Sequence, residues 1–426
     1  MTETTQEKFF SNSVLRQICL DEGADDVGFV EITRETISHE VKDILKAFNR
    51  TKTLMSIIKK ANRDSVQSQS LPVVNDEFIK SFRKLSDVSQ AVINRLNALG
   101  IRGVSVPAGF PMDFSRWPGK IWDISHKTIA TEAGIGNMGL NRLVIHPIYG
   151  NTISLGTILI DAGLDKYDHP IENKICINCK LCSFVCPVGA IDKTGDFNFM
   201  SCAMHNYHDL IGGFQDWIEG VVSSKSIKAY RAKHNDTETM NKWQSLTLGS
   251  MYRCSYCMAV CPAGKESLKD YTNNKKLYFE TIVMPLRTKK ENVYVIPNTI
   301  GHVSASKNPD KTLRFVNNTI RPNSIESFKK GITLAFNQVA AKGVNLKLLF
   351  EFTGKEPDTF CVSIHESKVE ILENVSDTNM TKLTADSETW VKVINNRTSL
   401  LSALVTGKVK IKWNPLHVGK FKKCLM

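Results

Sequence analysis

Eight of the 11 cysteines in this chain obey a tight spacing, and no other feature constrains the fold as strongly. The first run reads Cys176-x2-Cys179-x2-Cys182-x3-Cys186-Pro187; the second reads Cys254-x2-Cys257-x3-Cys261-Pro262, and Cys202 lies between them. A C-x2-C-x2-C-x3-C-P run donates three thiolates to one iron–sulfur cluster and its fourth thiolate to another. The spacing therefore predicts two adjacent [4Fe–4S] clusters.

The eight thiolates satisfy two four-ligand clusters with no cysteine left over. We assign cluster I to Cys176, Cys179, Cys182 and Cys261, and cluster II to Cys186, Cys202, Cys254 and Cys257. The alternatives are zinc, which favours isolated C-x2-C pairs, and disulfides, which so tight a run cannot easily form. Because clusters transfer single electrons, the chain either reduces a substrate or passes electrons onward. The other cysteines, Cys19, Cys361 and Cys424, are scattered, and we treat them as packing or surface residues.

The composition is that of an ordinary soluble protein, with 42% hydrophobic and 23% charged residues. A length of 426 residues favours two to four domains. No apolar run is long enough to cross a membrane, and the beginning, MTETTQEKFF, lacks the basic and apolar regions of a signal peptide. Reduced thiolate clusters then favour the cytoplasm.

The formal net charge is +12, and lysines are densest near the end of the sequence. Each oxidised [4Fe–4S] centre with four thiolates contributes about −2, so the loaded protein is less basic. Basicity fits simple solubility, an acidic electron donor, an anionic cofactor, an anionic membrane surface or nucleic acid. Nucleic acid is the least expected of these partners. The lysine-rich segment near the end of the sequence contains Lys408, Lys410, Lys412, Lys420, Lys422 and Lys423.

Residues 1–170 predict an α/β domain. Helical spacing is found over 13–22, 85–99 and 127–133, and strand patterns over 26–30, 104–107, 143–145 and 152–160. Residues 146–151, HPIYGN, predict a turn between the last two strands. The turn Gly134-x-Gly136-x-x-Gly139 follows a helix and leads into a strand, which is the reverse of a dinucleotide-binding fingerprint. We expect its glycines to allow close approach of another element or a bulky ligand.

Residues 171–290 predict a ferredoxin-like two-cluster domain. The long insert between Cys202 and Cys254 predicts surface helices. Three roles stay open for its His205 and His208: ordinary polar positions, ligands or proton donors. Residues 305–426 predict a separate α+β domain. It has an amphipathic helix over 325–339, two alternating strands joined by a turn at 353–358, and a helix that begins near Asp386. The fold class expected for the chain is α+β multidomain.

The segment DISHKTIATEAGIGNMGLNRLVIHPIYGNTISLGTILIDAGL (Asp123–Leu164), followed by the cysteine layout, resembles the superfamily of epoxyqueuosine reductase and the reductive dehalogenases. The resemblance implies a corrinoid-binding α/β domain of nitroreductase-like fold, a bound cobalamin, and clusters that transfer electrons to cobalt. It also implies a low-potential electron donor such as a ferredoxin or flavodoxin. Two departures are that Asp123 lies three residues closer to the glycine turn than in epoxyqueuosine reductase, and that the tRNA-binding repeat domain of that enzyme is missing.

Family enzymes place an acidic or phenolic proton donor over the cobalt, with a basic residue near the leaving group. The resemblance therefore implies catalytic candidates at Asp113, Asp123, His126, Lys127 and Tyr149. Each has a structural alternative: Asp123, for example, could serve simply as the cap of the helix that follows it. The turn offers Gly134, Gly136, Asn137 and Gly139 as cofactor contacts, because glycine lets a macrocycle approach backbone amides.

The strings LLFEFTGKEPDTFCVSI, KLTADSETWVKVIN and LLSALVTGKVKIKW resemble the sterol-carrier-protein type 2 fold, which encloses a tunnel for lipids. That resemblance implies a hydrophobic ligand for the third domain, although the same apolar residues could fill a solid core. The leading hypothesis is a cobalamin-dependent iron–sulfur reductase that removes oxygen or halogen from an organic substrate. Two other hypotheses are an electron-transfer or corrinoid-reducing protein, and a hydrophobic-ligand-binding protein with structural clusters.

Overall fold

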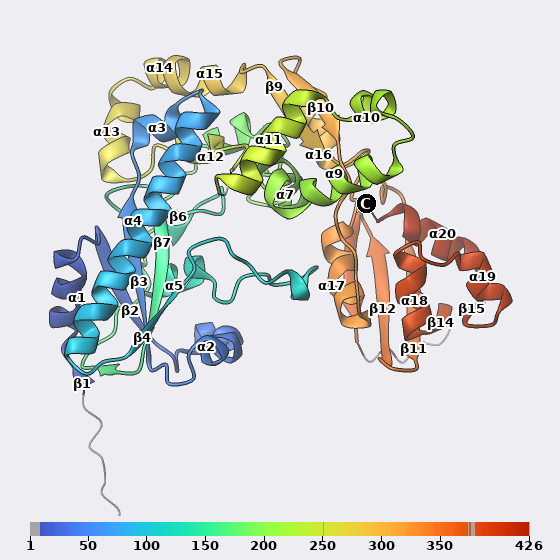
Figure 1. Ribbon diagram of the computed structural model, residues 1–426, viewed down its shortest axis with the longest axis horizontal. Helices are drawn as coiled ribbons and strands as arrows, with labels where there is room; N and C mark the ends of the chain where they lie inside the picture. The colour runs from blue at the N-terminus through green and yellow to red at the C-terminus, as the bar shows by residue number, and fades with distance from the viewer. Residues whose placement is uncertain (1–8, 250, 374, 376–379, 426) are drawn as a thin grey trace, which may run out of the picture.

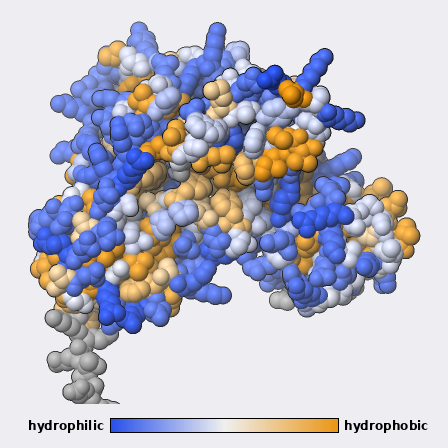
Figure 2. Space-filling view, viewed as in Figure 1, coloured by the Kyte–Doolittle hydropathy of each residue, from blue (hydrophilic) through white to orange (hydrophobic). Residues whose placement is uncertain are grey.

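The computed structural model describes residues 9–249, 251–373, 375 and 380–425, and it shows a mixed α+β protein of several layers (Figure 1). An N-terminal lobe and a C-terminal lobe lie on either side, and the cysteine-bearing segment spans the top between them. Figure 2 shows the molecule notched between the two lobes. Residues 1–8, which make up most of the MTETTQEKFF segment, lie outside the described residues.

A four-stranded antiparallel sheet organises the N-terminal lobe. Its strand order is β2 (Asp26–Glu31), β3 (Thr53–Lys60), β7 (Ile153–Ile160) and β4 (Gly103–Val106). Alternate residues of the central strands face opposite sides, so β3 sends Met55 and Ile57 to one core and Leu54 and Ile58 to the other. Helices α1 (Asn12–Asp21) and α4 (Leu71–Ala98) cover the first core. The 3-10 helix η1 (Glu35–Glu40), α2 (Val41–Ala47) and α5 (His126–Glu132) cover the second.

Three local predictions for this lobe need correction. The helix expected over 85–99 begins at Leu71, because Pro72 occupies its first turn and apolar residues continue the buried face. Strand β3 was not predicted, since its first six residues are buried on both faces and its TLMSIIKK sequence lacks alternation. The strands flanking HPIYGN do not form a hairpin: β6 (Val144–Ile145) pairs with β5 (Asn137–Met138), whereas β7 pairs with β3 and β4.

The cysteine-bearing segment consists of short helices. α6 (Leu181–Val185) lies within the first run and carries Cys182, α7 (Phe199–Asn206) carries Cys202, and α12 (Tyr256–Ala259) carries Cys257. The insert forms surface helices as expected: α8 (His208–Ile211), α9 (Gly213–Ser223), α10 (Ile227–Lys233) and α11 (Asp236–Thr247). A parallel pair, β9 (Glu291–Val295) and β10 (Lys311–Phe315), shares an apolar core with Val188 and Ala190 beside the cysteines. α3 (Arg63–Gln67), α13 (Lys265–Asn273), α14 (Lys275–Tyr278) and α16 (Ile300–Ala305) complete this region.

The C-terminal lobe is built on a five-stranded sheet with the order β13 (Lys368–Leu372), β12 (Asp358–His365), β11 (Leu346–Thr353), β14 (Thr381–Asp386) and β15 (Val409–Lys412). α17 (Ile325–Ala335), α18 (Ser387–Ile394) and α20 (Pro415–Lys423) pack on it, while α19 (Leu400–Val405) lies at its outer end (Figure 1). The core contains only residues between 325 and 425. Helix α17 ends at Ala335, four residues earlier than expected.

Aromatic rings fill the interior of this lobe. Phe350 lies 5.4 Å from Phe360, 5.6 Å from Phe328 and 5.9 Å from Trp390, measured between ring centroids. All four side chains are buried. These contacts are those of a packed core, which is the alternative that the sequence left open beside a lipid tunnel.

The segment of residues 107–125, here called the arm, extends from the N-terminal lobe to α17 (Figure 1). Its Trp117 indole donates to the Thr319 carbonyl at 3.3 Å, and Trp117 shares a core with Met200 of α7 and Ile320. Lys120 fixes the base of the arm through Glu40, at 2.6 Å. Within the residues that the structure describes, no helix is both long and apolar enough to cross a membrane.

Candidate iron–sulfur and cofactor site

The cysteines of the two runs lie close enough for their thiols to act on one another's pKa values. Burial, and then the neighbouring thiols of Cys261, Cys179 and Cys176, raise the pKa of Cys182 to about 12. Burial and the thiols of Cys186 and Cys254 likewise raise the pKa of Cys202. The neighbours of Cys182 are the other three residues assigned above to cluster I, and the neighbours of Cys202 are two of the other three assigned to cluster II.

Cys257 links the two groups. Burial raises the pKa of Cys257 well above its usual value, and so do the thiols of Cys202 and Cys186 of cluster II and of Cys182 and Cys261 of cluster I. The two sets of ligands are therefore neighbours, as electron transfer between clusters requires. In the described part of the chain, no three His, Cys, Asp or Glu side chains converge on the position of one metal ion.

The surroundings of the thiols favour the binding of a cationic cluster. The thiols are buried or half-buried, and burial raises the pKa of Cys254 and Cys261. A thiol must lose its proton to become a ligand, and a bound metal favours that loss. Backbone amides also point at the sulfurs: the Ala190 N–H donates to the Cys186 Sγ at 3.2 Å. Such donors stabilise a thiolate and influence the reduction potential of a cluster.

A small cavity lies among the four cysteines that we assign to cluster I. The four ligands Cys176, Cys179, Cys182 and Cys261 line it, together with Leu140, Asn141 and Ile145, which follow the glycine-rich turn. The Asn141 amide donates to the Cys257 carbonyl at 3.0 Å. The glycine-rich turn thus leads directly into the wall of cluster I.

The glycines of this turn are required by close packing inside the protein. A Cβ at Gly134 would lie 2.6 Å from the His169 carbonyl oxygen, and a Cβ at Gly136 would lie 2.2 Å from the Ile145 carbonyl oxygen. Asn137 donates to the Ile171 carbonyl at 2.8 Å. At Gly139 a Cβ would meet the Ile145 side chain at 2.7 Å. We expected these four residues to touch a macrocycle. In the structure each of them makes a close contact within the protein.

The HPIYGN segment joins the N-terminal lobe to the loop after Cys261. The Lys265 and Glu266 amides donate to the carbonyls of Pro147 and Ile148 at 2.8 and 3.0 Å. Gly150 has a φ of +66°, and a Cβ there would lie 2.3 Å from the Ala263 carbonyl oxygen. The segment therefore positions a ligand of cluster I.

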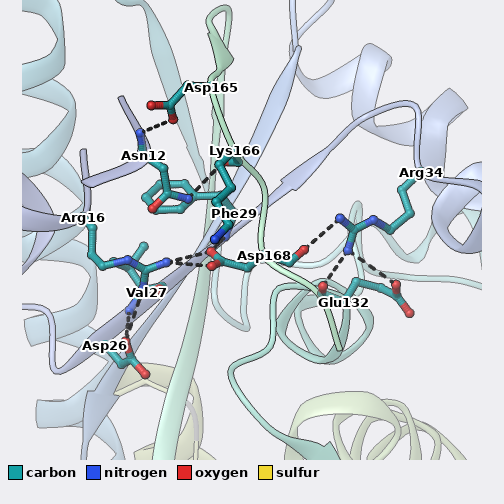
Figure 3. Close-up of polar contacts among 10 residues, drawn as sticks. All are labelled: Asn12, Arg16, Asp26, Val27, Phe29, Arg34, Glu132, Asp165, Lys166 and Asp168. Carbon is teal, nitrogen blue, oxygen red and sulfur yellow. Dashed lines mark hydrogen bonds and ion pairs between the residues drawn. The ribbon is translucent and has the colours of Figure 1, made fainter. Parts of the chain in front are cut away.

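The linker that leads to Cys176 is held by an ion-pair network that the sequence reasoning missed (Figure 3). Asp168 accepts two hydrogen bonds from Arg16, at 2.7 and 2.9 Å, and one from the Phe29 amide at 2.9 Å. Arg34 donates to the carbonyls of Asp168 and Glu132 at 2.8 and 2.7 Å. The network fastens the linker to β2 and α5, so it fixes where the first cysteine run begins.

Three polar side chains lie near the thiols that we assign to cluster II: Lys127, Tyr207 and Tyr252, which we call the α5–α7 face. The thiols of Cys202 and Cys257 act on the pKa of both Lys127 and Tyr207, so these side chains lie near the cluster II ligands. Lys127 is solvent-accessible, although the surrounding protein lowers its pKa, and its Nζ donates to the Arg142 carbonyl at 2.8 Å. The rings of Tyr207 and Tyr252 are 5.4 Å apart.

Sequence reasoning did not single out either tyrosine. The only signal was that Tyr252 stands two residues before Cys254, and Tyr207 five residues after Cys202. Burial raises the pKa of Tyr252 to about 12 and that of Tyr207 well above its usual value. Both phenols therefore keep their protons at neutral pH.

The other predicted catalytic residues occupy different places. His126 is fixed at both ring nitrogens, by Thr157 Oγ1 and the Pro107 carbonyl, each at 2.8 Å. Asp113 is exposed on the arm and accepts from the Ser115 amide, and Asp123 is half-buried at the end of the arm. Tyr149 stacks on His146 at 4.8 Å in the joint near cluster I. Of the five candidates, only Lys127 is placed beside cluster II by these contacts.

His205 and His208 pack on β9 rather than converging on a metal. Their rings stack on Tyr294, with centroids 6.5 and 4.1 Å away. Burial lowers the pKa of His205 to about 4 and that of His208 to about 3. Nearby, Glu291 accepts from the Tyr256 hydroxyl at 2.6 Å and pairs with the fully buried Lys311 at 2.8 Å.

Comparison with known proteins agrees with the cysteine chemistry. Residues 175–264 match the family described as a 4Fe-4S double cluster binding domain, and this range contains all eight predicted ligands. The prediction of 4Fe-4S clusters is thereby supported, and the centre of the chain is that of an iron–sulfur protein.

Among characterised proteins, the chain is similar to the epoxyqueuosine reductase of Bacillus anthracis, with 26% identity over 167 residues. The aligned region covers 39% of this chain and 36% of that protein, so the chain spans about a third of the relative's length. This confirms the relationship that the motifs suggested.

Two solved structures show more distant likenesses. Epoxyqueuosine reductase from Streptococcus thermophilus aligns with a TM-score of 0.37 and 14% identity, over 64% of this chain and 75% of that chain. A catabolic reductive dehalogenase aligns with a TM-score of 0.39 and 12% identity, over 64% and 35% of the two chains. Scores this low assign no function.

Proposed function

We propose that the chain is an iron–sulfur reductase whose two [4Fe–4S] clusters deliver electrons to a corrinoid at the α5–α7 face, for reductive removal of oxygen or halogen from an organic substrate. The observation that carries the proposal is the division of the eight thiols into two neighbouring groups, one of which lies beside Lys127 and Tyr207. The sequence similarity to epoxyqueuosine reductase supports the same chemistry.

When bound, a corrinoid would supply a low-valent cobalt that acts as a reductant and nucleophile. The residues of the α5–α7 face suit the other needs of such a reaction. A protonated phenol can donate the proton that a leaving oxygen or halide requires, and Tyr207 and Tyr252 both stay protonated at neutral pH. The Lys127 ammonium can stabilise a developing negative charge in the same place.

The first experiment is anaerobic purification from cells supplied with cobalamin, followed by quantification of iron, sulfide and cobalt. We expect about eight irons per chain, since each of two clusters holds four, and cobalt in stoichiometric amount. Cys202→Ala should lose iron from cluster II, whereas Cys424→Ala, a buried cysteine outside both runs, should keep the full iron content. Stoichiometric zinc with little iron would refute the proposal.

The second experiment separates a reductase from a protein that only transfers electrons. With a low-potential donor and a panel of epoxides and aryl halides, the reductase should turn over. Tyr207→Phe should retain its iron and cobalt but lose about 10²-fold or more in turnover, because it removes a general acid. Reduction of added cobalamin without turnover of any substrate would instead favour the electron-transfer hypothesis.

A further inference from the structure

Large apolar side chains protrude from the outer end of the C-terminal lobe. Leu401 and Val405 on α19 are 72% and 81% exposed, and Trp413 and Leu416 at the start of α20 are 72% and 71% exposed. Figure 2 shows apolar atoms at this end, bordered by hydrophilic ones. We call these four residues and the lysines around them the lobe tip.

Positive charge predominates around these side chains, although Asp386 lies near Lys408 and Glu351 near Lys412. From residue 389 to residue 426 the sequence contains no Asp or Glu. In the same stretch seven lysines are exposed: Lys392, Lys408, Lys410, Lys412, Lys420, Lys422 and Lys423. Lys423 lies toward the centre of the molecule, where it lines a cavity with Glu219. On α20, Lys420 is four residues after Leu416, so both project from the same face of the helix, opposite the buried Val418 and Phe421.

The need to protect an edge strand explains only part of this pattern. β15 is an edge of the sheet, and lysines such as Lys410 and Lys412 discourage the pairing of such edges between molecules. That function would be weakened, not helped, by exposing Leu401, Val405 and Trp413 beside them. The apolar residues therefore call for an occupant of their own.

We propose that the lobe tip docks on the surface of an anionic lipid bilayer. Apolar side chains on a helix, a tryptophan at the boundary and a surrounding ring of lysines are the features by which a protein lies in a membrane interface. The lysines would contact anionic headgroups, while Trp413 and its apolar neighbours enter the acyl boundary. Leu401 and Val405 belong to α19, Leu416 belongs to α20, and Trp413 lies just before α20. Exposed side chains on helices and a turn suit a deformable lipid surface.

This docking does not depend on the clusters or on the proposed reaction. It would bring an otherwise water-soluble reductase to a surface where apolar substrates collect. A reductase that fails the cobalt test could still bind vesicles, and a protein that does not bind vesicles could still be a reductase, so the two proposals fail separately.

The test is sedimentation of the full-length holoprotein with vesicles of phosphatidylcholine, with and without phosphatidylglycerol. We expect binding only to the anionic vesicles, and release by salt. Lys410→Gln with Lys422→Gln should weaken binding about tenfold or more, since each lysine near an anionic surface contributes several-fold. Trp413→Ser with Leu416→Ser should weaken it by a similar factor.

A charge-matched control is available at the far side of the molecule. Lys269→Gln with Lys276→Gln removes two exposed lysines near α13 and α14, and it should change binding less than twofold. An equal loss in both lysine pairs, or equal binding to both kinds of vesicle, would overturn the proposal. Every variant changes an exposed residue, and an unchanged circular dichroism spectrum and thermal unfolding midpoint will confirm that each is folded.

Tryptophan fluorescence tests which face touches the lipid. Brominated lipids should quench Trp413, and Trp413→Phe should keep most of the binding but lose that quenching. Trp243, which is 63% exposed on α11, is the matched control, and Trp243→Phe should leave the quenching unchanged. Quenching that follows Trp243 would overturn the proposal. So would an absence of vesicle binding together with cross-linking of the lobe-tip lysines to a reduced ferredoxin, which would assign the face to the electron donor.

Discussion

At the scale of single residues, two buried histidines should make the folding stability depend on pH. His205 and His208 have folded-state pKa values near 4 and 3 because burial disfavours their charged forms. In the unfolded chain they titrate near 6.5. Between about pH 6.5 and 4 the unfolded state therefore binds more protons than the folded state, and stability falls as the pH is lowered, by about 1 kcal/mol per pH unit for each histidine.

The prediction is tested with His208→Phe, which can keep the ring stacked on Tyr294. Chemical denaturation of the holoprotein between pH 7 and 5 should show a shallower loss of stability in this variant. His39→Gln is the control, since the side chain of His39 is 65% exposed. An identical pH dependence in wild type and His208→Phe would contradict the assignment of a neutral, buried imidazole.

A second prediction at the scale of residues concerns Lys311. Its side chain is fully buried and is paired with Glu291, which in turn accepts the Tyr256 hydroxyl beside the cluster II ligands. Lys311→Met would leave the Glu291 carboxylate without its main partner and should cost about 3–5 kcal/mol in the free energy of unfolding. Adding Glu291→Gln removes the stranded charge, so the double variant should recover part of the loss. Independent, additive effects would refute the coupling.

At the scale of elements, the joint between HPIYGN and the loop after Cys261 is the most specific test. Gly150→Ala places a methyl group against the Ala263 carbonyl and should displace Cys261, so iron at cluster I should fall while cluster II keeps its iron. Gly100→Ala is a matched control: its φ is +79°, also left-handed, but no atom lies within 4 Å of its Cβ position. The control should lose stability without losing iron. Iron loss in both variants, or in neither, would count against the joint.

The elements also show what the sequence could and could not predict. The cysteine runs predicted the double 4Fe-4S cluster domain, because the spacing of such cysteines is a local property of the chain. α1, α5 and α18 carried clear caps or periodicity and were predicted within a residue or two. β3 was not, since a strand buried on both faces has no alternation to detect. The partners of Asp168 and the approach of Tyr207 and Tyr252 depend on contacts between segments far apart in sequence, and no local pattern encodes them.

At the scale of the whole molecule, the centre and the C-terminal lobe are stabilised by different interactions. The centre relies on short helices around the thiols, which in the apoprotein would be buried without a cation to join them. The C-terminal lobe instead has a continuous core of aromatic and aliphatic residues that includes none of the eight ligands. Its stability should therefore depend little on the clusters.

Removal of iron should consequently separate the molecule into regions of different stability. After treatment with a chelator under reducing conditions, hydrogen exchange should accelerate in peptides around residues 176–186 and 252–262, because cluster ligation contributes folding energy there. Peptides from β11 and β12 should remain protected, since Phe350 and Phe360 still pack on Phe328 and Trp390. Reconstitution with iron and sulfide provides the control, and it should restore the slow exchange of the centre alone. Loss of protection in β11 and β12 together with the centre would show instead that the lobes unfold as one cooperative unit, held through the arm and its Trp117 contact with Thr319.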